Sequence, residues 1–590
     1  MGALFLYNKE QANINITSVL KLFEEMGFSK PHRIETDQWN IYAYSKMVGV
    51  YNNCVEFQGV KMISIGTPLY KRLNYKDGLQ ELIRDYVFNR LNLSELKGHF
   101  NLLFIKNNRI IILSDLLRSK HLFVDKTMSI ISSHMLAVCE GIIDNLSVNK
   151  NAVYEKLLTG IIMPPNTIFS NVHQINLDTE KKIERANIGV SFLNYQKNER
   201  YVRSQYSSKQ QCLNKQYEAL SVFFSGLKPQ SESGIDTGLS GGYDSRLVLA
   251  CMKRFINDNI HLHTHSTENV HQKDLNVALK MAEYVNVPCH IEKTNKLEHS
   301  ENIDAVLRKS ILYFDGRSSY SIGGCGEVYT AYYRKKSTEN IPMTLTGIGG
   351  ELYRNVFGIT NKKFKFCSFM EEKVFSHSFK KAVSPIIYEY ISKDVHYRAA
   401  KRLGIDSGKA CTREIAHRYY CEVLMPDGQG TALDAYNQVS CCVAPFMEPD
   451  IIYKGYNTIP FHGSSGDFEG DLIAEIDEGL ASIESSYGYP LNKRPAIIRI
   501  KEKVRQYVPA DVWSQMSNLL HLKSFNKSTN KDIDNIFYFS STLSSAFRYL
   551  RSLFPDVEFS YLLHTGEDVR RVQFIAMTLY YYKKRIVFSE

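Results

Sequence analysis

The residues with the clearest chemical potential are those at 239–245, which read LSGGYDS. They follow an apolar, strand-like run at 234–239 and precede a helical pattern at 245–255. Two adjacent glycines let backbone N–H groups approach an anion closely, the serine hydroxyls add donors, and the start of a helix carries partial positive charge. No Gly-Lys-Ser/Thr follows, so this is not a Walker A loop. A Ser/Gly turn that only caps the helix is the alternative. The predicted phosphate-binding residues are Leu239, Ser240, Gly241, Gly242, Asp244 and Ser245.

A second glycine-rich turn, TGIGGE at 346–351, follows another apolar run at 343–346. In a parallel sheet both turns emerge at the carboxyl edge, where ligands bind. A carboxylate beside phosphates is expected to bind a cation, and Mg²⁺ takes one or two carboxylates together with phosphate oxygens. We therefore predict that Asp244 and Glu351 hold Mg²⁺ and that Gly347 and Gly349 complete the nucleotide site. Arg354 is a candidate to grip a phosphate or a substrate carboxylate, and a surface ion pair is its alternative.

The elements that must position these turns alternate between strand and helix. Strand-like runs at 234–239, 260–265 and 289–292 are separated by helical patterns at 245–255 and 274–285. Short connections between alternating elements predict a parallel, doubly wound sheet. Three histidines alternate at 261, 263 and 265 and are expected to be packed or to lie near a nucleotide rather than to trap a metal. Beyond about residue 380 the chain is predicted to be mostly helical, with amphipathic stretches at 413–424, 472–483, 497–507 and 569–583.

Residues 1–197 follow a different pattern, in which many short β-like runs are separated by turn residues. This predicts an α+β unit with stacked sheets. The polar segment 198–211 is predicted to be a linker, and 212–590 a second domain. The expected strands are 3–7, 39–43, 60–65, 100–105, 110–113 and 130–132, and the expected helices are 16–25, 79–91 and 151–158.

In this order the motifs resemble the asparagine synthetase family, which includes β-lactam synthetase-like and lasso-peptide cyclase-like members. SGGYDS at 240–245 looks like the family's ATP-pyrophosphatase (PP-loop) motif, and TGIGGELYR looks like its second loop, with Glu351 in place of the metal-binding acid. FDGRSS at 314–319 is similar to the segment under the nucleotide, and PFMEPD at 445–450 to the helical segment after the active site. The resemblance implies a PP-loop domain that uses ATP and Mg²⁺ and forms AMP and pyrophosphate.

The first part of the chain resembles the family's Ntn-type glutaminase domain, at 98–100, 114–115, 121–123 and 132–133. That fold implies a four-layer αββα sandwich. Family glutaminases use a cysteine directly after the initiator Met. Once the Met is removed, the free α-amine of that cysteine acts as the base for its own thiol. Position 2 is Gly here, and the nearest cysteine is Cys54. We therefore expect an inactive class II glutamine amidotransferase-like domain, with ammonia or a substrate amine as the nucleophile.

Two other positions depart from the family pattern. Ile348 stands where familiar members have Glu or Tyr, and it cannot relay protons. The late lysine that stabilises the transition state has no clear counterpart, because residues 462–467 read HGSSGD. Lys493 is our candidate for that lysine, and a surface lysine is its alternative.

The predicted function is an ATP-dependent carbon–nitrogen ligase that adenylates a small-molecule or peptide carboxylate and lets ammonia or an amine displace AMP. Two other functions stay open: a PP-loop enzyme that modifies tRNA, and a non-catalytic partner in a complex. Neither a basic RNA module nor catalytic cysteines stand out, which disfavours nucleic acid as a partner. A homo-oligomer or a biosynthetic partner protein is compatible with the sequence.

The composition limits the class of protein and the kinds of site that the sequence can form. Of 590 residues, 44% are hydrophobic and 23% charged, as in ordinary globular proteins. The net charge of +10 is spread along the chain, and the eleven cysteines include no CxxC pair, which disfavours structural zinc. No run of 18 apolar residues and no signal peptide are found, so no membrane association and a cytoplasmic location are predicted.

Overall fold

The computed structural model describes residues 2–10, 13–48, 52–194, 208–267, 272–294, 303–317, 341–360, 362–406, 408, 410–463, 466–505, 540–563 and 565–587. Most of the predicted linker, 198–211, lies outside these ranges. In the described part of the chain, no helix is both long and apolar enough to cross a lipid bilayer.

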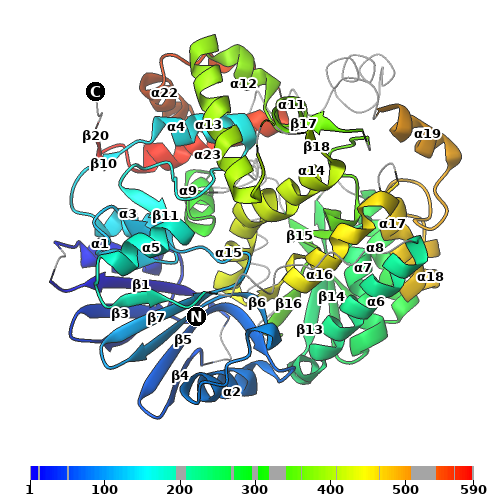
Figure 1. Ribbon diagram of the computed structural model, residues 1–590, viewed down its shortest axis with the longest axis horizontal. Helices are drawn as coiled ribbons and strands as arrows, with labels where there is room; N and C mark the ends of the chain where they lie inside the picture. Colours follow the sequence, from blue (N-terminus) through cyan, green and yellow to red (C-terminus); the bar gives the residue numbers. More distant parts are fainter. Residues whose placement is uncertain are drawn as a thin grey trace.

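A five-stranded parallel sheet lies at the centre of the second half of the chain (Figure 1). Its order is β15-β14-β13-β16-β19, and every neighbouring pair is parallel, so the predicted parallel sheet is confirmed. The last strand, β19, lies in the part of the chain predicted to be mostly helical. Its residues Cys441 and Cys442 extend the sheet and are buried in it. The strands are β13 (Ile235–Gly238), β14 (Ile260–Thr267), β15 (Cys289–Thr294), β16 (Met343–Leu345) and β19 (Cys441–Val443).

Helices cover this sheet and carry the candidate site. Helix α7 packs on β13, α8 packs on β14 and β15, and α17 packs on both α6 and α7. Their apolar faces form one buried cluster with the sheet. The bounds are α6 (Lys209–Gly226), α7 (Asp244–Cys251), α8 (Gln272–Val285), α16 (Pro449–Gly455), α17 (Asp467–Ile476) and α18 (Glu478–Ser482).

Two predicted helices differ from the structure. The stretch 472–483 is broken at Asp477, whose carboxylate accepts the backbone N–H of Leu480 at 2.9 Å and so starts a new helix, α18. The stretch 413–424 is α14 (Arg413–Tyr419) followed by the π-helix η7 (Tyr420–Gln429). Pro426 inside η7 lacks the N–H that a regular helix would use, and wide turns of this kind often occur at functional sites.

In the N-terminal part, two sheets stack face to face. The first, of order β11-β8-β9-β1-β3-β2, is entirely antiparallel, and the second has the order β12-β7-β6-β5-β4. Alternate residues of β1 point to opposite faces, so Leu4 and Leu6 enter the core between the sheets while Phe5 enters the core outside them. The first sheet comprises β1 (Ala3–Asn8), β2 (His32–Glu35), β3 (Trp39–Tyr44), β8 (Phe123–Asp125), β9 (Ile130–Ser132) and β11 (Val172–Gln174). The second comprises β4 (Cys54–Phe57), β5 (Val60–Tyr70), β6 (Leu96–Lys106), β7 (Arg109–Ser114) and β12 (Val190–Phe192).

Helices cover the outer faces of both sheets and complete what we call the N-terminal sandwich. Helices α1 (Ile16–Glu25) and α3 (Met135–Gly141) share a buried cluster with the first sheet, and α2 (Tyr75–Val87) packs on β4 and β5 of the second. The layers are therefore helix, sheet, sheet and helix.

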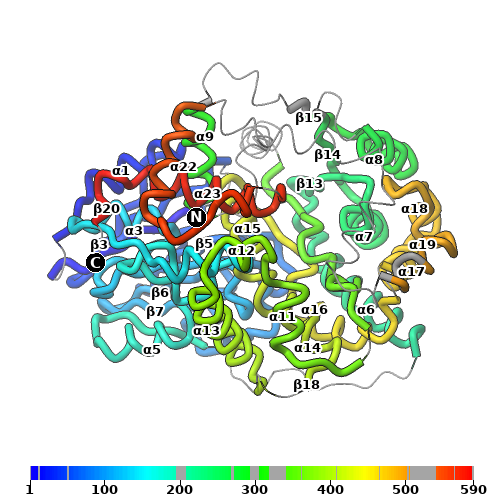
Figure 2. Tube along the Cα trace, turned by 90° about the horizontal axis from the view of Figure 1, so that it is seen from above, coloured from blue at the N-terminus to red at the C-terminus, as the bar shows by residue number. Residues whose placement is uncertain are grey.

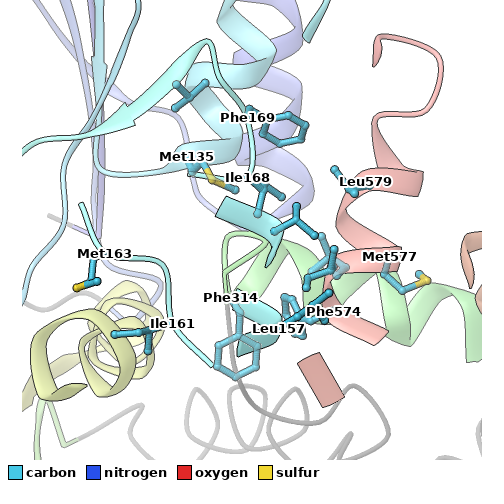
Figure 3. Packing of buried hydrophobic residues seen from close by; sticks show 14 of the residues in the cluster. Met135, Leu157, Ile161, Met163, Ile168, Phe169, Phe314, Phe574, Met577 and Leu579 are labelled. Carbon is cyan, nitrogen blue, oxygen red and sulfur yellow. The ribbon is translucent and has the colours of Figure 1, made fainter. Parts of the chain in front are cut away.

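The end of the chain returns to the N-terminal sandwich, as Figure 2 shows. Helix α23 (Gly566–Tyr581) packs on α4 (Lys150–Thr159), α9 (Ile303–Tyr313) and α22 (Ser541–Leu553). In Figure 3, Phe574, Met577 and Leu579 of α23 lie in one cluster with Met135 and Phe314. Residues far apart in sequence thus share one core.

Candidate active site

The two glycine-rich loops lie side by side at the carboxyl edge of the parallel sheet. Strands β13 and β16 are neighbours, with Ile235 opposite Met343, so the loops that follow them leave the same edge. A Cβ on Gly347 would lie 2.9 Å from the Asp244 Cβ, which requires glycine at this crossing. Gly349 has a φ of +90° and permits the left-handed turn into the second loop.

The phosphate loop is held by hydrogen bonds from its own polar groups. The Ser245 hydroxyl lies 3.0 Å from both the Ser240 amide and the Ser240 hydroxyl. The Gly242 amide donates to the Ser240 Oγ at 3.4 Å. The Gly241 amide donates to the carboxylate of Asp274, in the first turn of α8, at 3.0 Å. These hydrogen bonds fix the conformation of the loop at the start of α7. The preceding residue, Leu239, directly follows β13 and is buried.

Asp244 and Glu351 come together around Arg354. The Arg354 Nη2 contacts Asp244 Oδ1 directly and lies 3.7 Å from Glu351 Oε1. Burial raises the pKa of Asp244, and the charge of Glu351 raises it further, whereas Arg354 opposes both effects. For Arg354, burial lowers the pKa, but the surrounding carboxylates outweigh it and hold the pKa well above its usual value.

A third carboxylate, Glu469 of α17, completes this cluster and is absent from the sequence predictions. Its side chain is fully buried, and its Oε2 lies 3.0 Å from the Arg354 Nε. Both Glu469 oxygens are buried. Burial raises the pKa of Glu469 well above its usual range, and the charge of Asp244 adds to the effect. The sequence signal is only an acid at the start of an amphipathic helix, which usually faces solvent.

The π-helix η7 supports Glu351 from the other side. The Tyr420 hydroxyl donates to Glu351 Oε2 at 2.7 Å, and the Gln429 amide donates to the Tyr420 hydroxyl at 3.3 Å. A Cβ on Gly349 would lie 2.8 Å from the Met425 methyl group, so η7 also packs on the loop itself. The metal-binding acid predicted at 351 is therefore oriented by an element whose irregular geometry the helical pattern did not indicate.

Lys493 and Arg494 differ in their surroundings. The Lys493 side chain is exposed and has no ion pair or hydrogen bond to any described residue. The neighbouring Arg494 is buried, and its Nη1 lies 3.1 Å from Asp467 Oδ1. Burial raises the pKa of Tyr243, a residue of the phosphate loop, and the charge of Arg494 opposes this effect. Arg494 therefore lies near the phosphate loop. The buried cation is therefore one residue beyond the candidate chosen from the sequence.

Comparisons with known proteins give distant structural likenesses. No family model matches the chain, and no curated protein matches it. An NH₃-dependent NAD synthetase from Campylobacter jejuni is 17% identical, over 34% of this chain and 89% of its own, with a TM-score of 0.18. A glutamine-dependent NAD⁺ synthetase from Acinetobacter baumannii is 12% identical, over 70% of this chain and 96% of its own, also with a TM-score of 0.18.

The residues present fit a divalent cation that arrives with phosphate. In the described part of the chain, no group of three or more His, Cys, Asp or Glu side chains forms a ready metal centre. Asp244 and Glu351 still supply two carboxylates, which is what Mg²⁺ uses when phosphate oxygens and water complete its shell. Among the described residues, Arg354 is the one cation that pairs with Asp244 and Glu351, so a bound cation would compensate the charge that a single guanidinium leaves on these two acids.

In the N-terminal sandwich, the position after Met1 is closed. Gly2 is buried, and its amide donates to the Tyr44 carbonyl at 2.8 Å. A Cβ there would lie 2.7 Å from Phe28 Cε1 and 3.2 Å from Lys46 Cα. Cys54 lies in β4 of the second sheet, and burial raises the pKa of its thiol, which disfavours a thiolate.

A buried ion cluster joins the sandwich to the second half of the chain. Asp434 of α15 (Gly430–Val439) contacts Lys120 at 2.7 Å, His121 at 2.5 Å and Arg317 at 2.7 Å. Burial alone would raise the pKa of Asp434, but Lys120, the hydrogen bond with His121 and Arg317 hold it well below its usual value. Arg317 belongs to the predicted segment under the nucleotide, of which Ser318 and Ser319 lie outside the described residues. The segment's described part is therefore tied to the junction between the two halves.

Of the alternating histidines, His263 is buried and pairs with Asp236 of β13 at 2.9 Å. A Cβ on Gly238 would lie 3.0 Å from its Nε2. It therefore packs beneath the phosphate loop.

Proposed function

We propose that this protein is an ATP-dependent ligase of the asparagine synthetase type, which adenylates a carboxylate, releases pyrophosphate and forms an amide. The observation that carries the proposal is the meeting of Asp244 and Glu351, from two adjacent loops, around Arg354 at the carboxyl edge of a parallel sheet. A phosphate loop without a Walker A lysine, beside paired acids, suits chemistry at the α-phosphate.

The phosphate loop and the paired acids have distinct roles in this reaction. The amides and hydroxyls of the phosphate loop bind the leaving pyrophosphate, while the start of α7 adds partial positive charge. Asp244 and Glu351 would hold Mg²⁺, which, when bound, neutralises charge on the phosphates. A substrate carboxylate oxygen attacks the α-phosphorus and expels pyrophosphate. The nucleophilic nitrogen then attacks the acyl carbon, loses a proton and expels AMP. Most of the catalysis is positioning and charge stabilisation.

Arg494 is the cation best placed to take the role predicted for Lys493. It is buried beside the phosphate loop, whereas Lys493 is exposed. A buried guanidinium retains its charge and can form two parallel hydrogen bonds to a phosphate.

The N-terminal sandwich is proposed to be an Ntn-type domain that has lost glutaminase activity. Two stacked sheets between helical layers support the fold, and the closed surroundings of Gly2 support the loss, because a nucleophilic side chain has no space there. The nitrogen then comes from ammonia or from an amine on the substrate.

ATP–pyrophosphate exchange tests the proposal directly. The full chain is incubated with ATP, Mg²⁺, labelled pyrophosphate and one acid at a time, drawn from amino acids, sugar acids and peptides. Exchange that depends on one acid and is lost in Asp244→Asn is expected. Absence of exchange with every acid would favour a non-catalytic partner in a complex. A salt-dependent shift of tRNA on a gel would favour the tRNA-modifying alternative.

A further inference from the structure

Arg354 contacts three carboxylates through two different nitrogens. Its Nη2 contacts Asp244 and lies 3.7 Å from Glu351, whereas its Nε lies 3.0 Å from Glu469. The guanidinium is planar and rigid, so its edges can serve separate partners at the same time. One edge therefore faces the predicted metal-binding acids, and the other faces a residue of α17.

The position of Nη2 is one that a metal ion would need. A divalent cation shared by Asp244 and Glu351 would approach the same oxygens that Nη2 now approaches. Two cations cannot occupy that space, because like charges repel strongly at short range. The guanidinium therefore competes with a metal ion for this pair of acids.

Glu469 differs from the other two acids in its exposure. Its side chain is 0% exposed, against 27% for Asp244 and 35% for Glu351. Among the described residues, Arg354 is the one cation that forms an ion pair with it. A buried carboxylate is costly without a partner, so Glu469 is expected to retain the guanidinium when the other contacts are lost.

We propose that Arg354 is a built-in counter-ion of the metal site, which neutralises Asp244 and Glu351 while the site is empty and is retained by Glu469 when a divalent cation takes over those two acids. The proposal rests on the proposed function, since it assumes that these acids bind the metal. Once released from Asp244, the Nη groups are free to bind a phosphate or the substrate carboxylate. Metal and nucleotide are then expected to bind together, because the phosphates compensate the guanidinium that the metal displaces.

Mn²⁺ binding tests this without relying on activity. Free Mn²⁺ is measured by electron paramagnetic resonance with the full-length protein, with and without α,β-methylene-ATP. Without nucleotide, Arg354→Met is expected to bind Mn²⁺ about tenfold more tightly than wild type, equivalent to about 1.4 kcal/mol. The gain should vanish in the double variant Arg354→Met/Asp244→Ala. Arg494→Met, which removes another buried cation near the loop, is the control and should show no gain.

Glu469→Gln should behave in the opposite way. It keeps Nη2 between the two acids, so Mn²⁺ affinity without nucleotide should not increase. It loses the tether, so the affinity for Mn²⁺ with α,β-methylene-ATP should fall about tenfold. If Glu469→Gln bound Mn²⁺ in the presence of the analogue as tightly as wild type does, the role proposed for Glu469 would be overturned.

Equal Mn²⁺ affinity in wild type and Arg354→Met, or an equal gain in Arg494→Met, would overturn the counter-ion. Arg354→Lys is the second variant if Arg354→Met does not fold, which circular dichroism will reveal. Because one amine cannot serve all three acids, a partial gain is expected, and no gain would overturn the proposal. Failure of the proposed function looks different: Asp244→Ala would then bind Mn²⁺ with the analogue as wild type does.

Discussion

The backbone amide of Ser486 donates to the carbonyl of Gly241 at 3.1 Å, so the segment after α18 lies directly on the phosphate loop. Arg246, fully buried one residue beyond that loop's last serine, anchors the same segment by donating to the carbonyl of Leu480 at 2.9 Å and to that of Ile483 at 2.5 Å. The loop that is predicted to bind phosphate is thus fixed from behind by residues more than 200 positions away.

This packing predicts that replacing Gly241 by alanine destabilises the protein, whereas the same replacement of Gly242 does not. A Cβ on Gly241 would lie 2.5 Å from the Ser486 Cβ and 2.6 Å from Asp274 Oδ1, so Gly241→Ala should lower the free energy of unfolding by about 1–3 kcal/mol and weaken ATP binding. A Cβ on Gly242 would have no atom closer than 3.6 Å, so Gly242→Ala is the matched control for the free energy of unfolding. Urea unfolding and nucleotide titration measure both. Equal losses in the two variants would contradict the packing argument.

Isosteric replacement of the paired acids should stop the first chemical step. We expect Asp244→Asn and Glu351→Gln each to reduce ATP–pyrophosphate exchange about 100-fold or more, since metal-assisted transfer depends on several kcal/mol of charge stabilisation. Asp471→Asn is the control, because Asp471 lies on the same helix as Glu469 and pairs with Lys209 at the surface. Exchange at the wild-type rate in Asp244→Asn would refute the metal assignment.

Adjacent basic residues provide a second comparison. Lys493→Met should leave stability and exchange unchanged, because the side chain is exposed. Arg494→Met breaks the buried pair with Asp467 and should lower the free energy of unfolding by about 2 kcal/mol or more. It should also reduce exchange. A loss of exchange in Lys493→Met with wild-type stability would restore Lys493 as the catalytic cation.

The parallel sheet and the adjacency of its loops could be predicted from the sequence because both depend on local patterns. Alternating strands and helices specify a parallel sheet, and parallel strands end at one edge. The chain order then predicts that Asp244 lies near Glu351. Strand β19 was missed because three residues among helical patterns carry too little periodicity to indicate a strand.

The remaining site residues depend on tertiary contacts that no local pattern encodes. Glu469 is an acid on an amphipathic helix, and only the packing of α17 on α7 brings it to Arg354. The choice between Lys493 and Arg494 turns on a side-chain direction in an irregular segment, where neither a helical nor a strand period applies. The break at Asp477 follows from a capping hydrogen bond that competes with the helical pattern.

Glutamine should not supply nitrogen to this protein. We expect ammonia or an amine, and not glutamine, to support amide formation, and glutamate release from glutamine to be undetectable by coupled assay. Introducing a nucleophile should not restore activity: a Cβ at position 2 would lie 2.7 Å from Phe28, so Gly2→Cys should lower the free energy of unfolding by about 1–3 kcal/mol. Glutamate release at a rate that matches amide formation would show that the sandwich is active.

Acid should destabilise the N-terminal sandwich through His134. This histidine is buried beside Phe23 and Phe28 and lies 2.9 Å from the Ser133 hydroxyl. Burial, together with the nearby charges of Lys120 and Arg317, lowers its pKa from 6.5 to about 3, although Asp434 and Gln438 act in the opposite direction. Between pH 6.5 and 3 the unfolded chain therefore binds a proton that the folded chain does not, so stability falls as the pH falls through this window.

At pH 5 the loss from His134 should be about 2 kcal/mol relative to pH 7.5, since each pKa unit corresponds to about 1.4 kcal/mol. His134→Gln retains polar atoms but cannot take up the proton, so the stability difference between wild type and this variant should shift by that amount between the two pH values. His377→Gln, at an exposed position of α12 (His377–Ala382), is the control and should show no shift. The measurement is urea unfolding at pH 5, 6 and 7.5. Parallel losses of stability in wild type and His134→Gln would mean that His134 is protonated equally in the folded and unfolded chains.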